Sequence, residues 1–387
     1  MARRLLRQTL RYAFPLSLMA AAMSTAQADS LVRIPGASAE PTTFHALEGW
    51  STDDQGAAFG SFLKSCAAIL GGGRPSREAR PVYGGLYRVC AKAMTAGHLS
   101  AGKARAFFEA NFHPVRIVPH GEPGGFFTGY YETVMDGSLQ KTAEFDVPIY
   151  AMPRDPALAR ADRAAIENGL LRDKGLEIVW LKDPVDAFFA QIQGSARVQL
   201  AGGETMRIGY AGRNGLPYTA VGKFLIDRGI YTRDEMSMDK IREFMEAHPK
   251  EGHALRLKNR SYVFFKTIPL GKEEHAGGGQ GVELTPYRSV AIDRSIHAYG
   301  TPIWIDAMLP IASEKPETPF RHLAIAQDTG TAIVGPARAD IFFGSGENIG
   351  TVAGRIKQFG TFVMLVPNGV DIATATAQAA PVPRPRP

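Results

Sequence analysis

Hydrophobic residues recur at helical spacing in two stretches near the N-terminus, residues 57–70 (AAFGSFLKSCAAIL) and residues 84–94 (GGLYRVCAKAM). The stretch between them, GGGRPSREARP at residues 71–81, is rich in residues that interrupt helices. The pattern predicts a helical region from about residue 46 to residue 112. From residue 115 the chain reads VRIVPHGEPGGFFTGYYETVMDGS, whose β-branched and aromatic residues, separated by glycine, predict short strands and tight turns.

Residues 150–260 carry both kinds of pattern. The segments RADRAAIENGLL (160–171) and TRDEMSMDKIREFMEAH (232–248) predict helices, the second with Thr232 as its N-cap and Glu235 three residues later. The segments IVWLKDPVDAFFAQIQGSARV (178–198) and RVQLAGGETMRIGYAG (197–212) are strand candidates. This part of the chain is therefore expected to be of α/β type.

The β pattern returns at Tyr262 and continues almost to the C-terminus. Six segments predict strands: YVFFKTI (262–268), RSVAIDRSI (288–296), TPIWID (301–306), HLAIAQD (322–328), DIFFG (340–344) and GTFVMLVP (360–367). Because the β pattern of residues 114–134 resumes after about 130 residues, we predict a mainly β fold with a helical N-terminal region and an inserted α/β domain. The final stretch, ATATAQAAPVPRPRP, has no means of building a core and is expected to be disordered.

The first 28 residues have the layout of a secretory signal peptide. They contain four arginines, an apolar stretch from Tyr12 to Met23 and the small-residue pattern Ala26-Gln27-Ala28. We therefore expect an exported protein, and no later stretch reaches the ~18 apolar residues of a membrane span. Cleavage lowers the formal net charge of the chain from +6 to +2, so no nucleic-acid partner is expected.

The chain contains two cysteines, Cys66 and Cys90. An exported protein meets an oxidising compartment, so we predict a single disulfide that closes a loop of about 25 residues and stabilises the fold by roughly 3 kcal/mol. The alternative is a pair of buried free thiols.

Two aspartates, Asp328 and Asp340, lie beside apolar strand-like runs in AIAQDTGTAIVGPARADIFFG (324–344). An aspartic protease needs two Asp-Thr/Ser-Gly loops, and this chain has one. A carboxylic acid kept neutral by apolar neighbours suits glycoside cleavage better, because it can protonate the departing oxygen. The alternative is that both aspartates only cap turns. His297 and His322 have no ligand-type spacing, so neither a metal nor another cofactor is predicted.

The order and spacing of several short blocks resemble the MltA family, the lytic murein transglycosylases A of bacterial envelopes. These blocks cover about residues 126–367 and are FTGYYE (127–132), PIYAMP (148–153), QIQGSARV (191–198), YAGRNGLPYTAVGKFLIDRG (210–229), MSMDKIREF (236–244), SYVFFK (261–266), AIDRSIHAYGTPIWID (291–306), AQDTGTAIVGPARADIFFG (326–344) and AGRIKQFGTFVMLVP (353–367).

The resemblance implies a double-psi β-barrel domain interrupted by an inserted β-rich domain, with the substrate groove between them. The expected boundaries are a signal peptide at 1–28, the helical region and first part of the barrel at 29–134, the insert at 135–264, the rest of the barrel at 265–370 and the tail at 371–387. The last barrel segment also resembles the 3D module, named for three aspartates, here Asp293, Asp328 and Asp340.

The family's chemistry implies an exolytic lytic transglycosylase in which Asp340 is the catalytic acid and then the base. Asp328 would stay ionised and orient Asp340, and the product would be a 1,6-anhydromuramoyl end. The alternatives are a glycan hydrolase that uses both acids, and a non-catalytic peptidoglycan-binding protein. Groove residues expected to bind the glycan are Thr128, Gly129, Tyr130, Gln193, Ser195, Tyr210, Tyr218, Lys223 and Asp293.

The expected partners are peptidoglycan glycan strands and, as a further candidate, envelope machinery, and the chain itself is expected to be a monomer. Two features depart from the family. No cysteine stands directly after the predicted cleavage site, so a periplasmic protein without a lipid anchor is expected, either soluble or peripherally associated with the outer membrane. Thr331 stands where the family usually has glycine, in the loop before Asp340.

Overall fold

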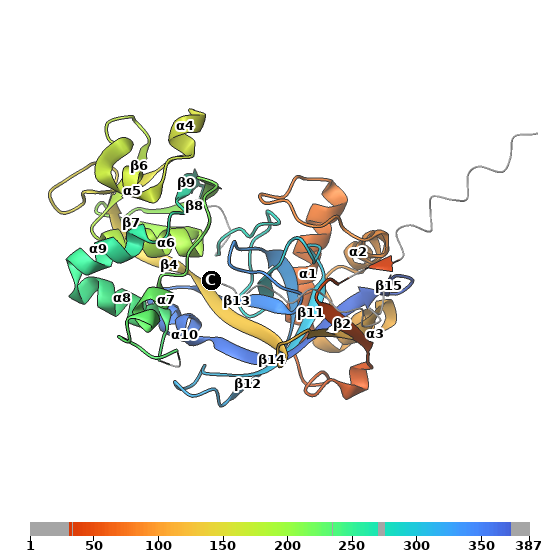
Figure 1. The fold of residues 1–387 in the computed structure, drawn as a ribbon. Coiled ribbons are helices and arrows are strands. Elements are labelled where there is room, and N and C mark those ends of the chain that lie inside the picture. The colour runs from red at the N-terminus through yellow and green to blue at the C-terminus, as the bar shows by residue number, and fades with distance from the viewer. Residues whose placement is uncertain (1–30, 33, 234, 270–274, 373–387) are drawn as a thin grey trace, which may run out of the picture.

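The structure, a computed structural model, describes residues 31–32, 34–233, 235–269 and 275–372 (Figure 1). The predicted signal peptide at residues 1–28 and the tail from residue 373 lie outside the described residues. Asp371 and Ile372, which the sequence assigns to the tail, instead form strand β15 (Asp371–Ile372), paired in parallel with β1 (Leu31–Val32). Among the described residues, no helix combines the length and apolar character needed to cross a membrane.

Three helices form the N-terminal region, as the apolar spacing predicts: α1 (Gln55–Gly71), α2 (Gly84–Ala96) and α3 (Ala101–Asn111). The carboxylate of Asp54 caps α1 by accepting from the backbone N–H of Ala57 at 3.2 Å. The disulfide predicted from the sequence joins Cys66 of α1 to Cys90 of α2, and both cysteines are fully buried. A short 3₁₀ turn, η1 (Phe44–Ala46), precedes the helices.

Six strands close into a ring that forms the barrel domain. In order around the ring they are β4 (Gly125–Ser138), β14 (Lys357–Pro367), β11 (Pro302–Leu309), β12 (Thr318–Asp328), β10 (Ser289–Ile292) and β13 (Arg338–Ser345), which pairs with β4 again. The pairs β10–β12 and β13–β4 are parallel and the others antiparallel. Two further strands, β2 (Ala37–Pro41) and β3 (Phe112–Pro119), extend the sheet from β14. Each of the six segments predicted to be strands from Tyr262 onward contains a strand, although in the segment 288–296 only Ser289–Ile292 is strand.

The insert forms a second sheet on the C-terminal half of β4. Its order is β5-β6-β4-β7-β8-β9, and a bridge from Ala151 to Phe265 brings its two edges together. These strands are β5 (Val147–Tyr150), β6 (Glu177–Leu181), β7 (Ser195–Leu200), β8 (Thr205–Arg213) and β9 (Val263–Ile268). The helical segments around them are α4 (Pro156–Ala159), α5 (Arg163–Ala165), the π-helical η2 (Ile166–Leu170), α6 (Pro184–Gln193), α7 (Gly222–Asp227), α8 (Met238–Ala247) and α9 (Pro249–Leu257).

The long strand β4 passes from the barrel into the insert (Figure 1). Its partner changes from β13 at Glu132 to β7 at Thr133. At this point the fully buried Glu132 carboxylate accepts hydrogen bonds from Arg197 Nε at 3.0 Å and Arg207 Nε at 2.7 Å, and from Ser345 Oγ at 2.8 Å. One buried acid thus connects both sheets. The residue boundaries predicted for the domains remain a prediction.

Two local predictions are wrong. The centre of the segment 178–198 is helix α6 rather than a strand, because Asp183 caps its first turn at Val185 N (2.7 Å), Pro184 occupies the first turn, and Gly194 ends it in the left-handed region. Helix α8 begins at Met238 with Ser237 as N-cap, whereas Thr232 and Glu235 bond to each other in a preceding turn.

Candidate active site

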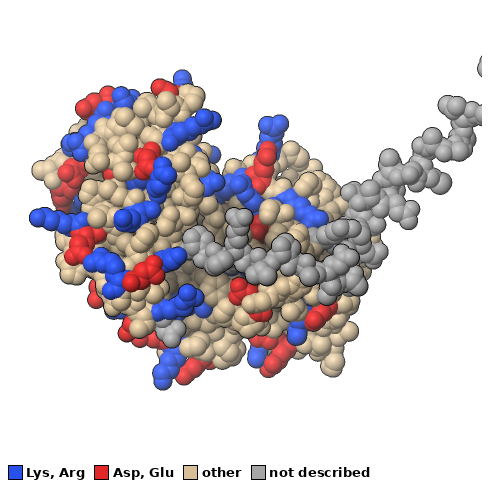
Figure 2. Space-filling view, in the orientation of Figure 1, with Lys and Arg blue, Asp and Glu red and all other residues tan. Residues whose placement is uncertain are grey.

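A cavity of about 560 Å³ lies between the barrel and the insert. A second cavity of about 260 Å³ adjoins it and shares six lining residues with it: Arg77, Tyr130, Gln193, Gly194, Tyr210 and Asp328. Acidic and basic side chains are interspersed over the face visible in Figure 2, so this face offers no continuous basic surface. Because they share those six lining residues, the two cavities form one groove, and the side chains that face it decide what it can bind.

The register of the barrel places both candidate acids in one row across five strands. Asp328 of β12 and Asp340 of β13 are both paired with Ala291 of β10, one on each side. The same row continues through Thr128 of β4 to Lys357 of β14. Neighbouring strands lie about 4.8 Å apart, so two acids twelve positions apart in sequence face the same groove.

Asp340 has an environment that disfavours loss of its proton. Burial raises the pKa of Asp340 above its usual range, and the charge of Asp328 adds to this rise. The Arg338 guanidinium and the hydrogen bond from the Thr128 hydroxyl act in the opposite direction. Arg338 Nη2 also donates to Thr128 Oγ1 at 2.7 Å, which fixes the hydroxyl that donates to Asp340. Asp340 can therefore act as a proton donor in the groove.

Asp328 is surrounded by hydrogen-bond donors. Its carboxylate accepts from the Tyr130 hydroxyl at 2.9 Å and from the backbone N–H groups of Gly279 at 2.7 Å and Thr329 at 2.8 Å. An ionised carboxylate, which only accepts, matches three donors. Burial and the neighbouring charge of Asp328 raise the pKa of Tyr130 well above 10, so its hydroxyl stays a donor. The two acids thus have different environments, one suited to a proton and one to a charge.

Close backbone approach explains two glycines of the site. A Cβ at Gly279 would lie 2.5 Å from the Tyr299 hydroxyl, so only glycine brings this N–H to Asp328. A Cβ at Gly129 would lie 2.8 Å from the carbonyl oxygen of Ala353 in helix α10 (Glu347–Arg355). Gly129, predicted as a substrate-binding residue, lines the larger cavity and is also required for this packing.

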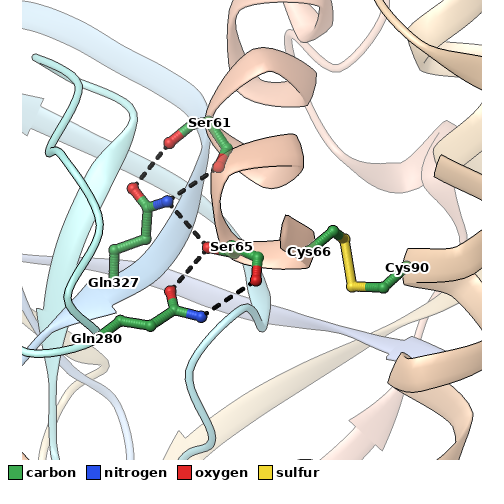
Figure 3. The surroundings of a disulfide bond; sticks show 6 residues. All are labelled: Ser61, Ser65, Cys66, Cys90, Gln280 and Gln327. Atoms are coloured by element: carbon green, nitrogen blue, oxygen red, sulfur yellow. Dashed lines mark hydrogen bonds between the residues drawn. A yellow bond between two sulfur atoms is a disulfide. The ribbon is translucent and has the colours of Figure 1, made fainter. Parts of the chain in front are cut away.

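Gln327, directly before Asp328, fixes the end of β12 to helix α1 (Figure 3). Its amide oxygen accepts from Ser61 Oγ at 2.9 Å and Ser289 Oγ at 2.6 Å. Its amide nitrogen donates to the Ser61 carbonyl and to Ser65 Oγ, both at 2.9 Å. Ser65 Oγ donates in turn to Gln280 Oε1 at 2.8 Å. This buried network is fully paired, which holds both Asp328 and the glycine loop beside it.

Arg77 is a groove residue that the sequence did not reveal. It lies between α1 and α2, in the stretch expected only to separate two helices. Its backbone N–H donates to the Gly279 carbonyl at 2.9 Å. Its guanidinium donates to the Thr329 carbonyl, lies 3.9 Å from Asp328 and stacks 4.0 Å over the Tyr210 ring. Arg77 thus contacts both walls of the groove. No local signal identifies it, because all its contacts are distant in sequence.

The other predicted binding residues are distributed unequally. Thr128, Tyr130, Gln193, Tyr210 and Tyr218 line the larger cavity, and Ser195 lines the smaller one. Lys223 is exposed on α7 and lines neither of these cavities. Their roles toward a substrate remain predictions.

The third aspartate, Asp293, lines the larger cavity but is engaged by its own loops. Its carboxylate accepts from the backbone N–H and hydroxyl of Ser295, at 2.9 and 2.6 Å, and from Gly335 N at 2.8 Å. Asp293 thereby holds the loop between Asp328 and Asp340, in which Thr331 is exposed. This geometry favours a positioning role over contact with substrate.

The two histidines considered as metal ligands have protein partners. His297 Nε2 donates to the Pro336 carbonyl at 2.7 Å, and burial lowers its pKa to about 4. His322 Nδ1 lies 2.8 Å from the buried Asp53 carboxylate. Within the described part of the chain, no three His, Cys, Asp or Glu side chains are grouped so as to hold a metal ion.

Comparison with known proteins gives two family matches. Residues 126–266 match the family model described as MltA specific insert domain, and residues 288–366 match the 3D domain. The membrane-bound lytic murein transglycosylase A of Vibrio cholerae is 34% identical over 239 residues, which is 60% of this chain. The chain spans 63% of the length of that relative.

Solved structures match over more of the chain. The membrane-bound lytic murein transglycosylase from Agrobacterium tumefaciens has a TM-score of 0.76 and 33% identity, over 85% of this chain and 98% of that one. Escherichia coli MltA with bound chitohexaose has a TM-score of 0.62 and 31% identity, over 73% of this chain and 82% of that one.

Proposed function

The chain belongs to the MltA family, and from this premise we propose that it is a lytic transglycosylase of peptidoglycan. Its fold is the double-psi β-barrel with an inserted domain. The proposed reaction cleaves the β-1,4 bond between N-acetylmuramic acid and N-acetylglucosamine and leaves a 1,6-anhydromuramoyl end. The bound chitohexaose of the Escherichia coli relative supports a glycan strand as the substrate.

The observation that carries the proposal is Asp340, a half-buried acid that faces the groove and whose pKa is raised by desolvation. Asp340 donates its proton to the glycosidic oxygen as the bond from muramoyl C1 to that oxygen breaks. The muramoyl C6 hydroxyl then attacks C1, and its proton passes to the Asp340 carboxylate. The proton balance closes within one turnover, so one residue serves as acid and base and no water is consumed.

Asp328 supplies negative charge in the same row. As the bond at C1 breaks, the sugar ring gains positive charge, which an ionised carboxylate fixed by three donors stabilises. The hydrogen bonds to Asp328 are made before substrate arrives, so no reorganisation is needed during the reaction. Asp328 is thus an electrostatic group and Asp340 the proton carrier.

The proposed location is the bacterial envelope, reached by export. The arginine-rich apolar N-terminus of the sequence supports it, as do the envelope relatives named above. Peptidoglycan is the partner that this location supplies. The expectations of a monomer, exolytic action and contact with envelope machinery remain part of this proposal.

Two substitutions test the division of roles. Asp340→Ala should abolish formation of anhydromuropeptides from purified peptidoglycan, as measured by mass spectrometry, while glycan binding persists because most groove contacts lie elsewhere. Asp328→Asn should be milder yet severe, because it removes charge rather than the proton carrier. If Asp328→Asn were the more damaging, or if Asp340→Ala still formed anhydro products, the assignment would be wrong.

A further inference from the structure

The face of the barrel that carries Asp340 continues into a pair of phenylalanines. Sheet register places Phe126 of β4 between Phe359 of β14 and Arg338 of β13. Each of these residues is two positions along its strand from the row that contains Asp340. Two positions correspond to about 6.6 to 6.8 Å, and side chains two apart point to the same face.

Side-chain contacts bear out this common face. The rings of Phe126 and Phe359 have centroids 5.0 Å apart, and the Arg338 guanidinium lies 5.2 Å from the centre of the Phe126 ring. Arg338 also donates to the Thr128 hydroxyl, which donates to Asp340. Phe359 is 46% exposed and Phe126 is half-buried. We call Phe126, Phe359 and Arg338 the phenylalanine platform.

The platform is continuous with the groove. Arg338 lines the larger cavity, and so does Lys357 of the row that contains Asp340. Phe126 and Phe359 line neither cavity; Phe126 lies directly beside Arg338, and Phe359 beside Phe126. On the other side of Asp340 the next row holds Phe342 beside Tyr130, whose hydroxyl donates to Asp328. The platform therefore extends the groove on the side of Asp340 away from Tyr130.

Resting on the proposed function, we propose that the phenylalanine platform binds one N-acetylhexosamine ring of the glycan strand that Asp340 cleaves. A pyranose ring presents an apolar face of C–H groups, which packs on an exposed aromatic ring, while the guanidinium beside it offers donors to ring hydroxyls. The occupant follows from the position of the platform beside the groove. A glycan that lies against Asp340 meets the platform one row of side chains further along the sheet. The competing explanation is a cross-strand aromatic pair that only stabilises the β4–β14 pairing.

Binding in an inactive background tests the platform without turnover. The parent is the Asp340→Asn variant, the probe is chitohexaose, and the dissociation constant is measured by calorimetry. Adding Phe359→Ala should weaken binding about tenfold, because the apolar contact between the sugar ring and the phenyl ring is lost. Phe359→Trp should restore affinity to within about twofold, because it keeps an aromatic face.

The matched control is Tyr87→Ala, since Tyr87 on α2 is 45% exposed, close to the 46% of Phe359, and lies far from Asp340 in sequence and outside both cavities. It should leave the dissociation constant unchanged. An unchanged constant for Phe359→Ala, with or without a lower melting temperature, overturns the platform. Cleavage of peptidoglycan by the unaltered chain is assayed separately, so failure of the proposed function and failure of the platform are distinguishable.

Discussion

Asp340 combines two properties: its carboxyl group is desolvated enough to raise its pKa, and it faces a cavity of about 560 Å³. The first property favours the protonated acid, and the second lets a bound glycan accept the proton on its glycosidic oxygen. Because desolvation disfavours the charged form, ionisation of Asp340 destabilises the folded state. Stability and activity should therefore respond oppositely to its removal.

The Asp340→Asn variant should gain stability over the unaltered chain as the pH rises. The pKa of Asp340 is raised by folding, so above the unfolded value of about 3.9 the folded state holds a proton that the unfolded state has lost. The stability of the unaltered chain therefore falls as the pH rises from the unfolded-state pKa of Asp340 to its folded-state pKa. The asparagine of the variant does not titrate. The difference in melting temperature between the two proteins should widen as the pH rises from about 4 toward the folded-state pKa of Asp340.

The control for that measurement is Asp146→Asn, which removes an exposed carboxylate. Its difference in melting temperature should stay constant over the same pH range. A difference for Asp340→Asn that also stays constant would contradict the desolvated, proton-holding acid.

Arg77 should matter for turnover although it lies outside the barrel. Arg77→Ala removes the stacking on Tyr210, the bond to the Thr329 carbonyl and the cation nearest Asp328. We expect kcat/KM on peptidoglycan to fall about 10- to 100-fold, the range for losing a charged hydrogen bond. Arg74→Ala, on the same segment and exposed, should have no effect. Equal losses for both variants would show that Arg77 acts only on the segment's fold.

At the scale of elements, helix α1 supports the acid site from behind. Ser61 and Ser65, one turn apart, bond the amides of Gln327 and Gln280, and the next residue, Cys66, is linked to α2 (Figure 3). The disulfide also closes the segment that carries Arg77. The N-terminal helices thus position the groove, although sequence reasoning assigned them no chemistry.

Loss of the disulfide should lower the free energy of unfolding by about 3 kcal/mol, because the unfolded chain gains the freedom of a loop of 24 residues. Urea unfolding with and without reductant measures this difference. The Cys66→Ser/Cys90→Ser double variant should match the reduced protein and not respond to reductant. If reduction left the urea midpoint unchanged, the link would not constrain the unfolded chain.

Local patterns predicted most elements and missed those that depend on distant partners. The strands after Tyr262 follow from runs of β-formers, and the two acids follow from their apolar neighbours. The segment around Pro184 reads as a strand because its apolar residues are continuous, yet the caps at Asp183 and Gly194 decide for a helix. Arg77 could not be predicted, because its position depends on contacts with Gly279, Thr329 and Tyr210, all more than 130 residues away.

At the scale of the whole molecule, the groove exists because two sheets share one strand. Along β4, Thr128 and Tyr130 face the acids, and Glu132 enters the buried cluster with Arg197 and Arg207. The contacts that hold the barrel against the insert therefore lie on β4 only a few residues from the side chains that face the two acids. A change in this cluster should alter both stability and the shape of the groove.

Glu132→Gln should destabilise the protein by about 3 kcal/mol, since it leaves buried arginine charge without its counter-charge. Urea unfolding measures the loss, and kcat/KM should fall as well because the groove walls shift. The control is Glu144→Gln, which breaks an exposed ion pair with Lys182 and should have little effect. Equal, small effects for both would show that the cluster does not hold the two sheets together.

The central claim is that Asp340 moves a proton between two groups of the glycan and that water takes no part. Digestion of purified peptidoglycan in water labelled with heavy oxygen tests it most directly. The account predicts products that end in 1,6-anhydromuramic acid and carry no label, formed by the unaltered chain and absent with Asp340→Asn. Products with labelled reducing ends would contradict it, because they would show that Asp340 and Asp328 activate water and that the chain is a hydrolase.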